Sequence, residues 1–293
     1  QRDIRSVLHI KDIINDSFNQ LEELYNSKKL ITGVPSGFTD LDFMTSGFQK
    51  SDLVLVASRP SMGKTSFALN IAQHAAIHEQ IPVVIFSLEM SREQIVNRMI
   101  ACEVMIESQK LRTGKLTDED WQKIAIAVGP LSEAPIYIDD SAGVSVQEIG
   151  AKCRRLKLEK DVQLVIIDYL QLMQGRGRAE NRQQEISEIS RSLKILAKEI
   201  GVPIIALSQL SRNPDARTDH HPMLSDLRES GAIEQDADLV LFLYRDDYYT
   251  KEKSEKPNIT EVMIAKHRNG STGTVDLRWF GEYTKFANYL RND

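Results

Sequence analysis

Residues Leu53–Thr65, LVLVASRPSMGKT, decide the fold of this chain. An apolar run of strand length leads into a loop that ends in Gly63-Lys64-Thr65, and a helical pattern over Ser66–Ala76 follows at once. This order is typical of a phosphate-binding loop, whose backbone N–H groups face an anion at a helix N-terminus. Ser58 replaces the first glycine of the general pattern. We expect a nucleotide to contact Ser58, Arg59, Pro60, Ser61, Met62, Gly63, Lys64, Thr65 and Ser66.

Strand-length apolar runs alternate with helical patterns along most of the chain. This alternation predicts an α/β fold in which a mostly parallel, twisted sheet carries helices on both faces. Near the end of the chain, the runs Ile259–Arg268 and Thr274–Phe280 flank the turn sequence Gly270–Gly273 and predict an antiparallel hairpin. The expected parallel strands are Leu53–Ala57, Val83–Ser87, Ile136–Ile138, Val165–Asp168, Ile204–Ser208 and Leu239–Leu243.

Two helix boundaries are marked by local sequence. Asp120 stands three residues after Thr117, an acidic form of the capping box that predicts a helix start. The helical pattern Arg182–Ile200 is followed by Gly201 and then by Pro203, which together predict its end.

Three polar residues follow predicted strands. Glu89, Asp168 and Gln209 each stand at or just after the end of an apolar run. The carboxyl ends of parallel strands meet at the edge of a sheet where ligands bind, so these side chains should lie beside the phosphate loop. Asp168 would then hold Mg²⁺ with Thr65, Glu89 would act on water, and the Gln209 amide would sense the γ-phosphate. A helix cap or surface charge is the alternative for either carboxylate alone.

Composition limits the kinds of partner. The formal net charge of −5 argues against a broad basic surface, so any contact with nucleic acid must be local. No apolar run approaches the roughly 20 residues that a membrane span needs, and no signal-peptide pattern opens the chain, so we expect a cytoplasmic protein without membrane contact. Cys102 and Cys153 lack disulfide or zinc spacing and should be buried. His74 and His78 share a helix face, but no third metal ligand stands near them.

An amphipathic helix is predicted ahead of the main domain. Its apolar residues recur at three- and four-residue steps over residues 4 to 25. Two roles fit the pattern equally from the residues alone: the stripe folds back on its own core, or it docks on a neighbouring subunit. The apolar positions are Ile4, Val7, Leu8, Ile14, Phe18, Leu21 and Tyr25.

Eight ordered segments together resemble one family, the C-terminal ATPase domain of DnaB-type replicative helicases. They are spread over roughly residues 30 to 290, and as a set they are far more specific than a phosphate loop alone. The segments are GVPSGFTDLD (33–42), ASRPSMGKT (57–65), FSLEM (86–90), LRTGKL (111–116), VIIDYLQL (165–172), LSQLSR (207–212), SDLRESGAIEQDAD (225–238) and KHRNGSTG (266–273).

The resemblance implies a RecA-like P-loop fold and ATP-driven 5′→3′ unwinding of DNA by a ring of six copies. ATP and Mg²⁺ are the implied cofactors, with Lys64 and Thr65 as their contacts. Glu89 becomes the catalytic base, Asp168 the Walker-B acid and Gln209 the sensor.

A second implication concerns residues that act on a neighbouring subunit. Lys266 and Arg268 stand two apart in a predicted strand and so share one face. The resemblance places both against the γ-phosphate held by the adjacent subunit, in an arginine-finger arrangement. A pair of solvated strand-end charges is the ordinary alternative.

For DNA, the resemblance points to two loops that line a central channel around single-stranded DNA. Small residues let backbone N–H groups approach phosphates, and arginines add local charge. A surface loop without a ligand is the alternative for each. The residues implied to contact DNA are Arg176 and Arg178 in the first loop, and Arg228, Glu229 and Gly231 in the second.

The resemblance also divides the chain. It makes residues 1–30 a linker helix that docks on a neighbouring subunit and residues 31–293 the RecA-like ATPase domain. The family's N-terminal helical domain does not precede the linker here, so we expect this sequence to be a fragment of a longer protein. A primase and a helicase loader are the implied protein partners.

Two rival functions share parts of the pattern. A RecA-like recombinase or signalling ATPase would keep the phosphate loop, Glu89 and Asp168 without unwinding DNA. A nucleotide-gated loader or scaffold would need no catalytic acid, and Glu89 argues against it. The segments 225–238 and 266–273 favour the helicase, on resemblance rather than on physical derivation.

Overall fold

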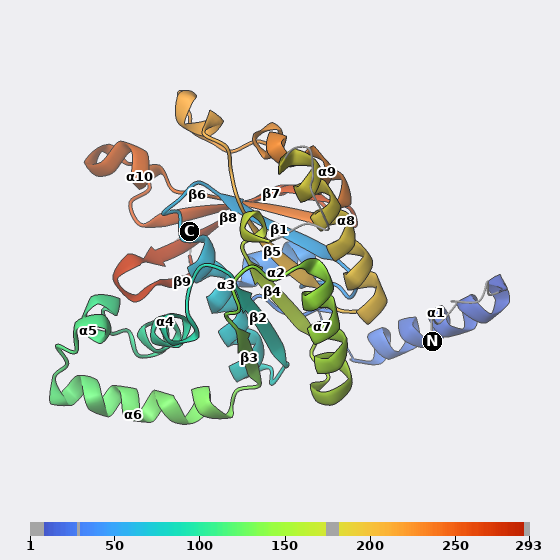
Figure 1. The fold of residues 1–293 in the computed structure, drawn as a ribbon, viewed down its shortest axis with the longest axis horizontal. Coiled ribbons are helices and arrows are strands. Elements are labelled where there is room, and N and C mark those ends of the chain that lie inside the picture. The colour runs from blue at the N-terminus through green and yellow to red at the C-terminus, as the bar shows by residue number, and fades with distance from the viewer. Residues whose placement is uncertain (1–8, 28–29, 174–181, 290–293) are drawn as a thin grey trace.

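A single sheet organises the computed structural model, which describes residues 9–27, 30–173 and 182–289. The sheet has nine strands in the order β3-β2-β4-β5-β1-β6-β7-β8-β9 (Figure 1). Its strands are β1 (Leu53–Ser58), β2 (Val83–Ser87), β3 (Ile136–Asp139), β4 (Leu164–Asp168), β5 (Ile204–Gln209), β6 (Leu239–Tyr244), β7 (Ile259–His267), β8 (Gly273–Phe280) and β9 (Lys285–Asn288).

The helices connect and cover these strands. Short 3₁₀ or π segments are η1 (His74–His78), η2 (Leu170–Leu172), η3 (Asn213–Ala216), η4 (Leu224–Ser230), η5 (Lys251–Lys253) and η6 (Gly281–Tyr283). The α-helices are α1 (Ile10–Ser27), α2 (Thr39–Thr45), α3 (Lys64–Gln73), α4 (Arg92–Val104), α5 (Ser108–Thr113), α6 (Asp118–Glu133), α7 (Val146–Lys160), α8 (Arg182–Ile200), α9 (Gly231–Asp236) and α10 (Asp246–Thr250).

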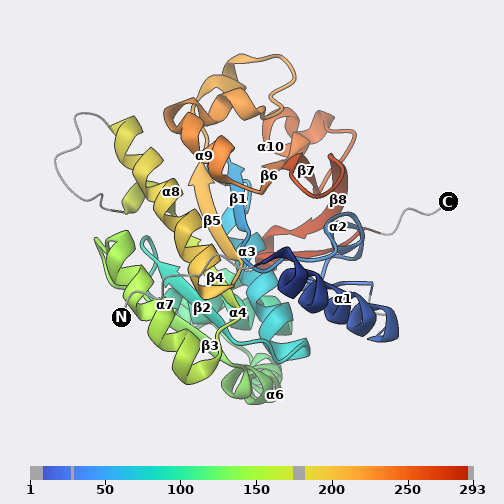
Figure 2. The same cartoon turned by 90° about the vertical axis from the view of Figure 1, so that its right-hand side faces the viewer.

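The predicted parallel strands form one side of the sheet, from the edge strand β3 to β6. β1 lies between β5 and β6, and β4 lies between β2 and β5, with every one of these pairs parallel. Their side chains are buried almost throughout, because helices cover both faces (Figure 2). The six strands all form within about a residue of the ranges expected from the apolar runs, so the α/β prediction is confirmed.

Two hydrophobic clusters lie on opposite faces of this sheet. One contains Phe67 and Ile71 of α3 with Ile95 of α4. The other contains Ile149 of α7 and Leu193 of α8. Alternate residues of each strand contribute to the two clusters, so β1 is fixed from both sides and the loop that follows it starts from a rigid point.

The C-terminal hairpin forms as predicted and is extended by one strand. β7 pairs antiparallel with β6 and with β8, which confirms the expected hairpin. The further strand β9 pairs antiparallel with β8. No prediction covered β9, whose four residues are too short for a periodic signal.

The predicted helix boundaries are also confirmed. Thr117 and Asp120 make the reciprocal bonds of a capping box at the start of α6. Helix α8 ends at Ile200, and Gly201 follows with φ of +65°, the left-handed conformation that favours glycine.

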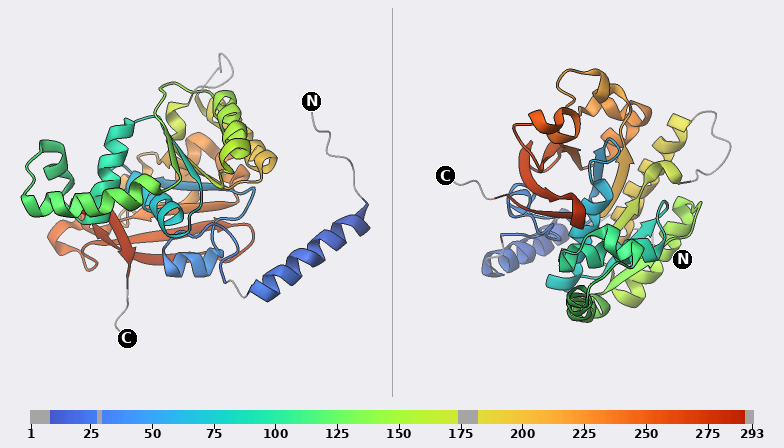
Figure 3. Two further views of the ribbon diagram at one scale, coloured as in Figure 1. Left: turned by 90° about the horizontal axis from the view of Figure 1, so that it is seen from below. Right: turned by 90° about the vertical axis from the view of Figure 1, so that its left-hand side faces the viewer.

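Helix α1 stands away from the body of the molecule (Figures 1 and 3). Its apolar side chains are exposed, among them Ile14 at 55%, Phe18 at 66% and Leu21 at 63%. The helix therefore does not fold back on its own core, which removes one of the two roles considered for it. The expected positions Ile4, Val7 and Leu8 lie outside the described residues.

The membrane, cysteine and metal features expected from the sequence can be compared with the described residues. In the part of the chain that the structure describes, no helix is long and apolar enough to cross a membrane. Cys102 and Cys153 are free and buried, and burial raises the pKa of each thiol, to about 11 for Cys102. The rings of His74 and His78 lie 5.2 Å apart, yet the described residues contain no group of three or more histidine, cysteine or acidic residues placed to hold a metal ion.

Candidate active site

The loop between β1 and α3 has the backbone shape of a phosphate cradle. Gly63 has φ of +93° and caps the N-terminus of α3, and Ser61 also lies in the left-handed region at +67°. A Cβ on Gly63 would stand 2.8 Å from Cζ of Phe286, closer than packed atoms approach. Glycine is therefore required here for both backbone conformation and space. The N-terminus of α3, with its free backbone N–H groups, opens onto this loop.

A cavity of about 450 Å³ surrounds the loop. Most of the loop residues expected to meet a nucleotide line it, as do Glu89 and Gln209. The side chain of Met62 is only 1% exposed and packs in the hydrophobic core with Phe67, so the expected contact of Met62 with a nucleotide would come from its backbone. The full lining comprises Ser58, Arg59, Pro60, Ser61, Gly63, Lys64, Thr65, Ser66, Glu89, Arg98, Tyr169, Gln209, Trp279 and Thr284.

Thr65, which lines this cavity, contacts the buried residue Asp168. The hydroxyl of Thr65 donates to Oδ2 of Asp168 at 2.7 Å. The other carboxylate oxygen, Oδ1, is buried and has no hydrogen-bond partner among the described residues. Burial raises the pKa of Asp168, while the Thr65 hydroxyl and the charge of Lys64 oppose that rise. A hydroxyl beside a carboxylate with a free oxygen is the donor set that holds nucleotide-bound Mg²⁺, so the site fits that ion.

Lys64 is enclosed in the same cavity. Burial lowers the pKa of its ammonium, and the charges of Asp168 and Glu89 partly restore it. Its Nζ lies 4.8 Å from the centre of the Tyr169 ring. A cation that is buried without a close ion pair is costly, and phosphate oxygens would relieve that cost.

Arg98 is a pocket residue that the sequence-based prediction missed. It comes from α4, lines the cavity, and has the charges of Asp168 and Glu89 nearby, although burial lowers the pKa of its guanidinium. A signal existed: Arg98 stands three residues after Ile95 and four before Cys102, both buried, so helical spacing places it on the inward face. Arg98 therefore adds a further positive charge to the lining of the cavity that also contains Lys64.

Gln209 ends β5 directly beside Ser58 of the loop. Gln171, which follows β4, fixes this strand end. The Gln171 side-chain amide donates to Oγ of Ser208 at 2.9 Å and to the Gln209 carbonyl at 3.1 Å, and its oxygen accepts from the Gln209 N–H at 3.3 Å. The Gln209 side chain is thereby presented to the cavity from a fixed backbone.

Arg59 is turned toward the protein rather than held free for a ligand. Its guanidinium donates to both carboxylate oxygens of Asp215, at 3.1 and 2.6 Å, and to the Leu210 carbonyl at 3.0 Å. Asp215 also accepts from the Tyr249 hydroxyl at 3.0 Å. These bonds hold one side of the phosphate loop against the segment that follows β5.

Lys266 and Arg268 lie at the amino ends of the parallel strands, whereas the chain's own cavity lies at their carboxyl ends. Lys266 pairs with Val240 near the start of β6, whereas the loop follows the carboxyl end of β1. A strand as long as β1 spans roughly 17 Å, too far for either side chain to reach the chain's own phosphate loop. The two cations do share a face, as expected, because both donate to the carbonyl of Gln235.

The segments expected to contact DNA are only partly described. Arg176 and Arg178 lie outside the described residues. The backbone that carries Arg228, Glu229 and Gly231 passes from η4 into α9. This turn is fixed by Asp226, whose carboxylate accepts from the N–H of Met223 at 2.7 Å and pairs with Arg217.

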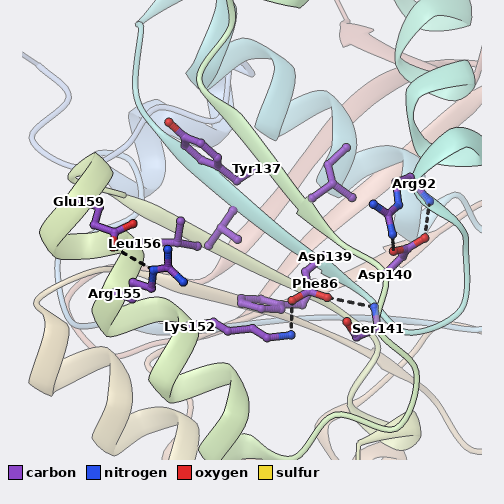
Figure 4. Close-up of a pocket in the computed structure, with 12 residues that line it drawn as sticks. Phe86, Arg92, Tyr137, Asp139, Asp140, Ser141, Lys152, Arg155, Leu156 and Glu159 are labelled. Carbon is purple, nitrogen blue, oxygen red and sulfur yellow. Dashed lines mark hydrogen bonds and ion pairs between the residues drawn. The ribbon is translucent and has the colours of Figure 1, made fainter.

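A second cavity of about 430 Å³ lies between the edge strand β3 and α7 (Figure 4). Its cationic side chains are committed to neighbours within the same cavity. The pairs are Arg92 with Asp140 at 2.8 Å, Lys152 with Asp139 at 2.5 Å, and Arg155 with Glu159 at 2.9 Å. Because these charges are already paired, the cavity around the phosphate loop remains the candidate active site.

Most of this chain matches one family of known proteins. The family model described as "DnaB-like helicase C terminal domain" matches residues 33–288. Replicative DNA helicase DnaB of Geobacillus stearothermophilus is 60% identical over 97% of this chain, and replicative DNA helicase DnaC of Bacillus subtilis is 58% identical over 97%. The chain spans 62% of the length of each of these two relatives.

Solved structures give the same result. One solved ATPase domain superposes with a TM-score of 0.92 at 45% identity, covering 97% of this chain and 100% of that one. A DnaB-like replicative helicase, described together with its interactions with primase, superposes with a TM-score of 0.88 at 44% identity. That match covers 99% of this chain and 69% of the other.

Proposed function

The chain belongs to the family of DnaB-like helicase C-terminal domains, and we propose that it is the motor domain of an ATP-dependent replicative DNA helicase. In this proposal, a ring of six copies hydrolyses ATP and translocates 5′→3′ on single-stranded DNA. The observation that carries the proposal is the bond from Thr65, which lines the cavity with Lys64 and Glu89, to Asp168, whose second carboxylate oxygen has no hydrogen-bond partner among the described residues. This arrangement has the parts that nucleotide hydrolysis requires.

Each pocket residue has a role in hydrolysis under this proposal. Lys64 and the N-terminus of α3 bind the β- and γ-phosphates. Thr65 and Asp168 hold Mg²⁺, which supplies charge that offsets the negative charge of the phosphates. Glu89 accepts a proton from the attacking water, and the Gln209 amide contacts the γ-phosphate.

Lys266 and Arg268 complete a neighbour's pocket rather than their own. Their distance from the chain's own loop supports this role, since they can contact a phosphate only across an interface. Arg268 remains 45% exposed in spite of its contacts, so part of its guanidinium is open to a partner. Hydrolysis then depends on assembly, because a lone subunit lacks the charge that stabilises the transition state.

Helix α1 is proposed to dock on the neighbouring copy. Its exposed apolar stripe lies on one side of the molecule, and α4, α5 and α6 project on the opposite side (Figure 1). These three helices and their connections also expose large apolar side chains, which would be covered by the stripe in a head-to-tail ring. The exposed residues on that side are Val96, Met105, Trp121, Ile126 and Val128.

The DNA and protein partners follow from the same proposal. The segment of Arg228–Gly231, together with Arg176 and Arg178, is assigned to the channel that holds single-stranded DNA. A few phosphate contacts in each subunit, repeated around a ring, suit a chain with a net charge of −5. A primase and a helicase loader are the proposed protein partners. The similar DnaB-like helicase that is described with its interactions with primase supports the first of these.

The test combines strand displacement with ATP hydrolysis. A duplex with a 5′ single-stranded tail should be unwound, and a duplex with a 3′ tail should not. Single-stranded DNA should also stimulate hydrolysis. DNA-dependent hydrolysis without displacement of either duplex would favour a recombinase or signalling ATPase, and nucleotide binding without hydrolysis would favour a loader or scaffold.

A further inference from the structure

The cations proposed to act on the neighbour are held by the C-terminal end of α9. Nζ of Lys266 donates to the carbonyls of Glu234 at 2.6 Å and Ala237 at 2.8 Å. Nη2 of Arg268 donates to the carbonyl of Gln235 at 2.5 Å. Cations suit this position, because the last carbonyls of a helix lack partners within the helix and carry partial negative charge.

Asp238 supplies a formal negative charge in contact with Arg268. Oδ1 of Asp238 lies 3.2 Å from Nη1 of Arg268, and the Arg268 backbone N–H donates to the Asp238 carbonyl at 2.9 Å. Asp238 therefore holds both the backbone at the end of β7 and the guanidinium of Arg268.

Asp238 is itself rigidly fixed. Its side chain is buried, and Oδ2 accepts from the backbone N–H of Leu53 at 2.8 Å and pairs with Lys194 of α8. Nζ of Lys194 also donates to the Ser51 carbonyl at 2.8 Å. The carboxylate that contacts Arg268 thus sits on the start of β1, the strand that leads to the phosphate loop.

We propose that Asp238 is a positioning residue for Arg268, which it holds in the orientation needed to contact the nucleotide bound by the adjacent subunit. This inference rests on the proposed trans-acting role of Arg268. An arginine has several rotatable bonds, and an unrestrained side chain would lose conformational freedom each time it engaged a phosphate. A guanidinium already held by Asp238 and Gln235 has lost most of that freedom before the neighbour arrives, and its exposed remainder can bind.

Helix α9 connects the two cations to the segment that is proposed to contact DNA. The helix begins at Gly231, within the segment proposed to contact DNA, and ends at the carbonyls that hold Lys266 and Arg268. Six residues of helix span only about 9 Å. A shift of the DNA-binding segment would therefore reach both cations through one short, hydrogen-bonded element.

The test uses Asp238→Asn in the full chain, since asparagine keeps an oxygen for the Leu53 N–H while removing the charge. We expect the kcat for ATP hydrolysis by assembled rings to fall about tenfold or more, with KM for ATP and affinity for single-stranded DNA within about twofold of the original protein. The matched control is Asp161→Asn, an exposed residue at the end of α7. Unchanged kcat in Asp238→Asn, or a kcat that rises, would overturn the inference.

Mixed rings separate positioning from a general loss of structure. Lys64→Ala subunits keep an intact Arg268 but lack a working pocket, so mixing them with Asp238→Asn subunits should restore hydrolysis at interfaces where the two meet. Mixing Arg268→Ala with Asp238→Asn should restore none, because neither supplies a positioned guanidinium. If Lys64→Ala rescues Arg268→Ala but not Asp238→Asn, the inference fails while the proposed function stands. If it rescues neither, the trans-acting role fails first.

A milder variant serves if Asp238→Asn does not assemble into rings of the original mass. Lys194→Gln removes the charge that pairs with Asp238 and so loosens the hold on this carboxylate, while Asp238 and Arg268 stay unchanged. It should lower kcat by a smaller factor, about twofold to fivefold, with KM unchanged. A kcat equal to that of the original protein would then overturn the inference.

Discussion

Charged residues lie at both ends of the parallel strands, which we call the carboxyl edge and the amino edge. The two edges differ in whether these residues have bonding partners within the protein. At the carboxyl edge, Lys64 is half-buried and makes no ion pair, and one oxygen of Asp168 is buried without a hydrogen-bond partner, among the described residues. At the amino edge, Asp238 is satisfied by Leu53, Lys194 and Arg268. Buried polar groups that lack partners are costly, so their presence indicates a ligand, whereas a satisfied cluster indicates a scaffold.

This difference explains how one sheet can serve two pockets. Under the proposed function, the carboxyl edge supplies the groups that bind a nucleotide, and the amino edge supplies the cations that contact the nucleotide of a neighbouring copy. A rigid sheet between them fixes the distance from one function to the other.

The largest expected effect comes from the amino edge. Arg268→Ala should lower ATP hydrolysis by about 10³-fold or more, because an arginine finger contributes that much to phosphoryl transfer. Nucleotide binding, measured by fluorescence of a labelled ATP analogue, should be retained. Arg155→Ala, which removes an exposed arginine of α7, is the control and should hydrolyse ATP normally. Intact turnover in Arg268→Ala would leave the amino edge with a structural role only.

The next effect comes from the carboxyl edge. Glu89→Gln should reduce kcat by about 10²- to 10⁴-fold, since a general base contributes that range, while the amide keeps the shape of the side chain. ATP should still bind, as measured by calorimetry. Glu93→Gln, on the exposed surface of α4, is the control. If Glu89→Gln hydrolyses ATP at the original rate, the proton acceptor is another group.

The next prediction concerns Gly63, whose backbone conformation and close contact with Phe286 require glycine. Gly63→Ala should destabilise the fold by about 1–3 kcal/mol, because it forces a side chain into the left-handed region and against Phe286. Thermal unfolding should show a lower Tm, and nucleotide affinity should fall as well. Gly129→Ala is the matched control: it lies within α6 with open space around it, so alanine should raise stability slightly. Equal behaviour of the two variants would contradict the expected strain.

The smallest effect is a pH dependence at the amino edge. Burial and the nearby charge of Asp238 raise the pKa of Asp52 to about 6, while Lys194 and Arg268 act in the opposite direction. A carboxyl whose pKa is higher in the folded state than its usual 3.8 favours folding when protonated, so its contribution to stability is lost as pH rises through about 6. Asp52→Asn should therefore raise Tm at about pH 7.5 relative to the original protein, and the difference should become small at about pH 3.8, the usual pKa of the carboxyl. A difference in Tm that is the same at both pH values would contradict this expectation.

Much of the fold could be predicted from the sequence because apolar runs mark parallel strands strongly. β1 and β5 are buried on both faces, so continuous apolar character and strand length coincide. β9 gave no such signal, since its four residues are partly exposed and its pairing depends on β8. The place of Met62 in the loop predicts a backbone contact with the nucleotide, but it does not predict that the Met62 side chain packs in the core.

Prediction of the site from the sequence is limited in the same way, because contacts between distant segments give no local signal. Residues attached directly to strand ends, such as Glu89 and Gln209, could be located because chain order and sheet direction fix them. Helical spacing could place Arg98 on the inward face of α4, but the sequence could not show what it meets there, the charges of Glu89 and Asp168. Asp238 gave no such signal, because its importance arises from contacts that join the start of β1 to Arg268. Such contacts exist only after the chain has folded.

The measurement that tests the central claim most directly is the ATP turnover per subunit as a function of protein concentration, with the mass of the assembly followed by light scattering. We predict almost no turnover from the monomer and a steep rise as rings of six copies form, with a further increase when single-stranded DNA is added. Turnover per subunit that is independent of concentration, from a species with the mass of a monomer, would contradict the claim, because each subunit would then hydrolyse ATP without its neighbour's Arg268.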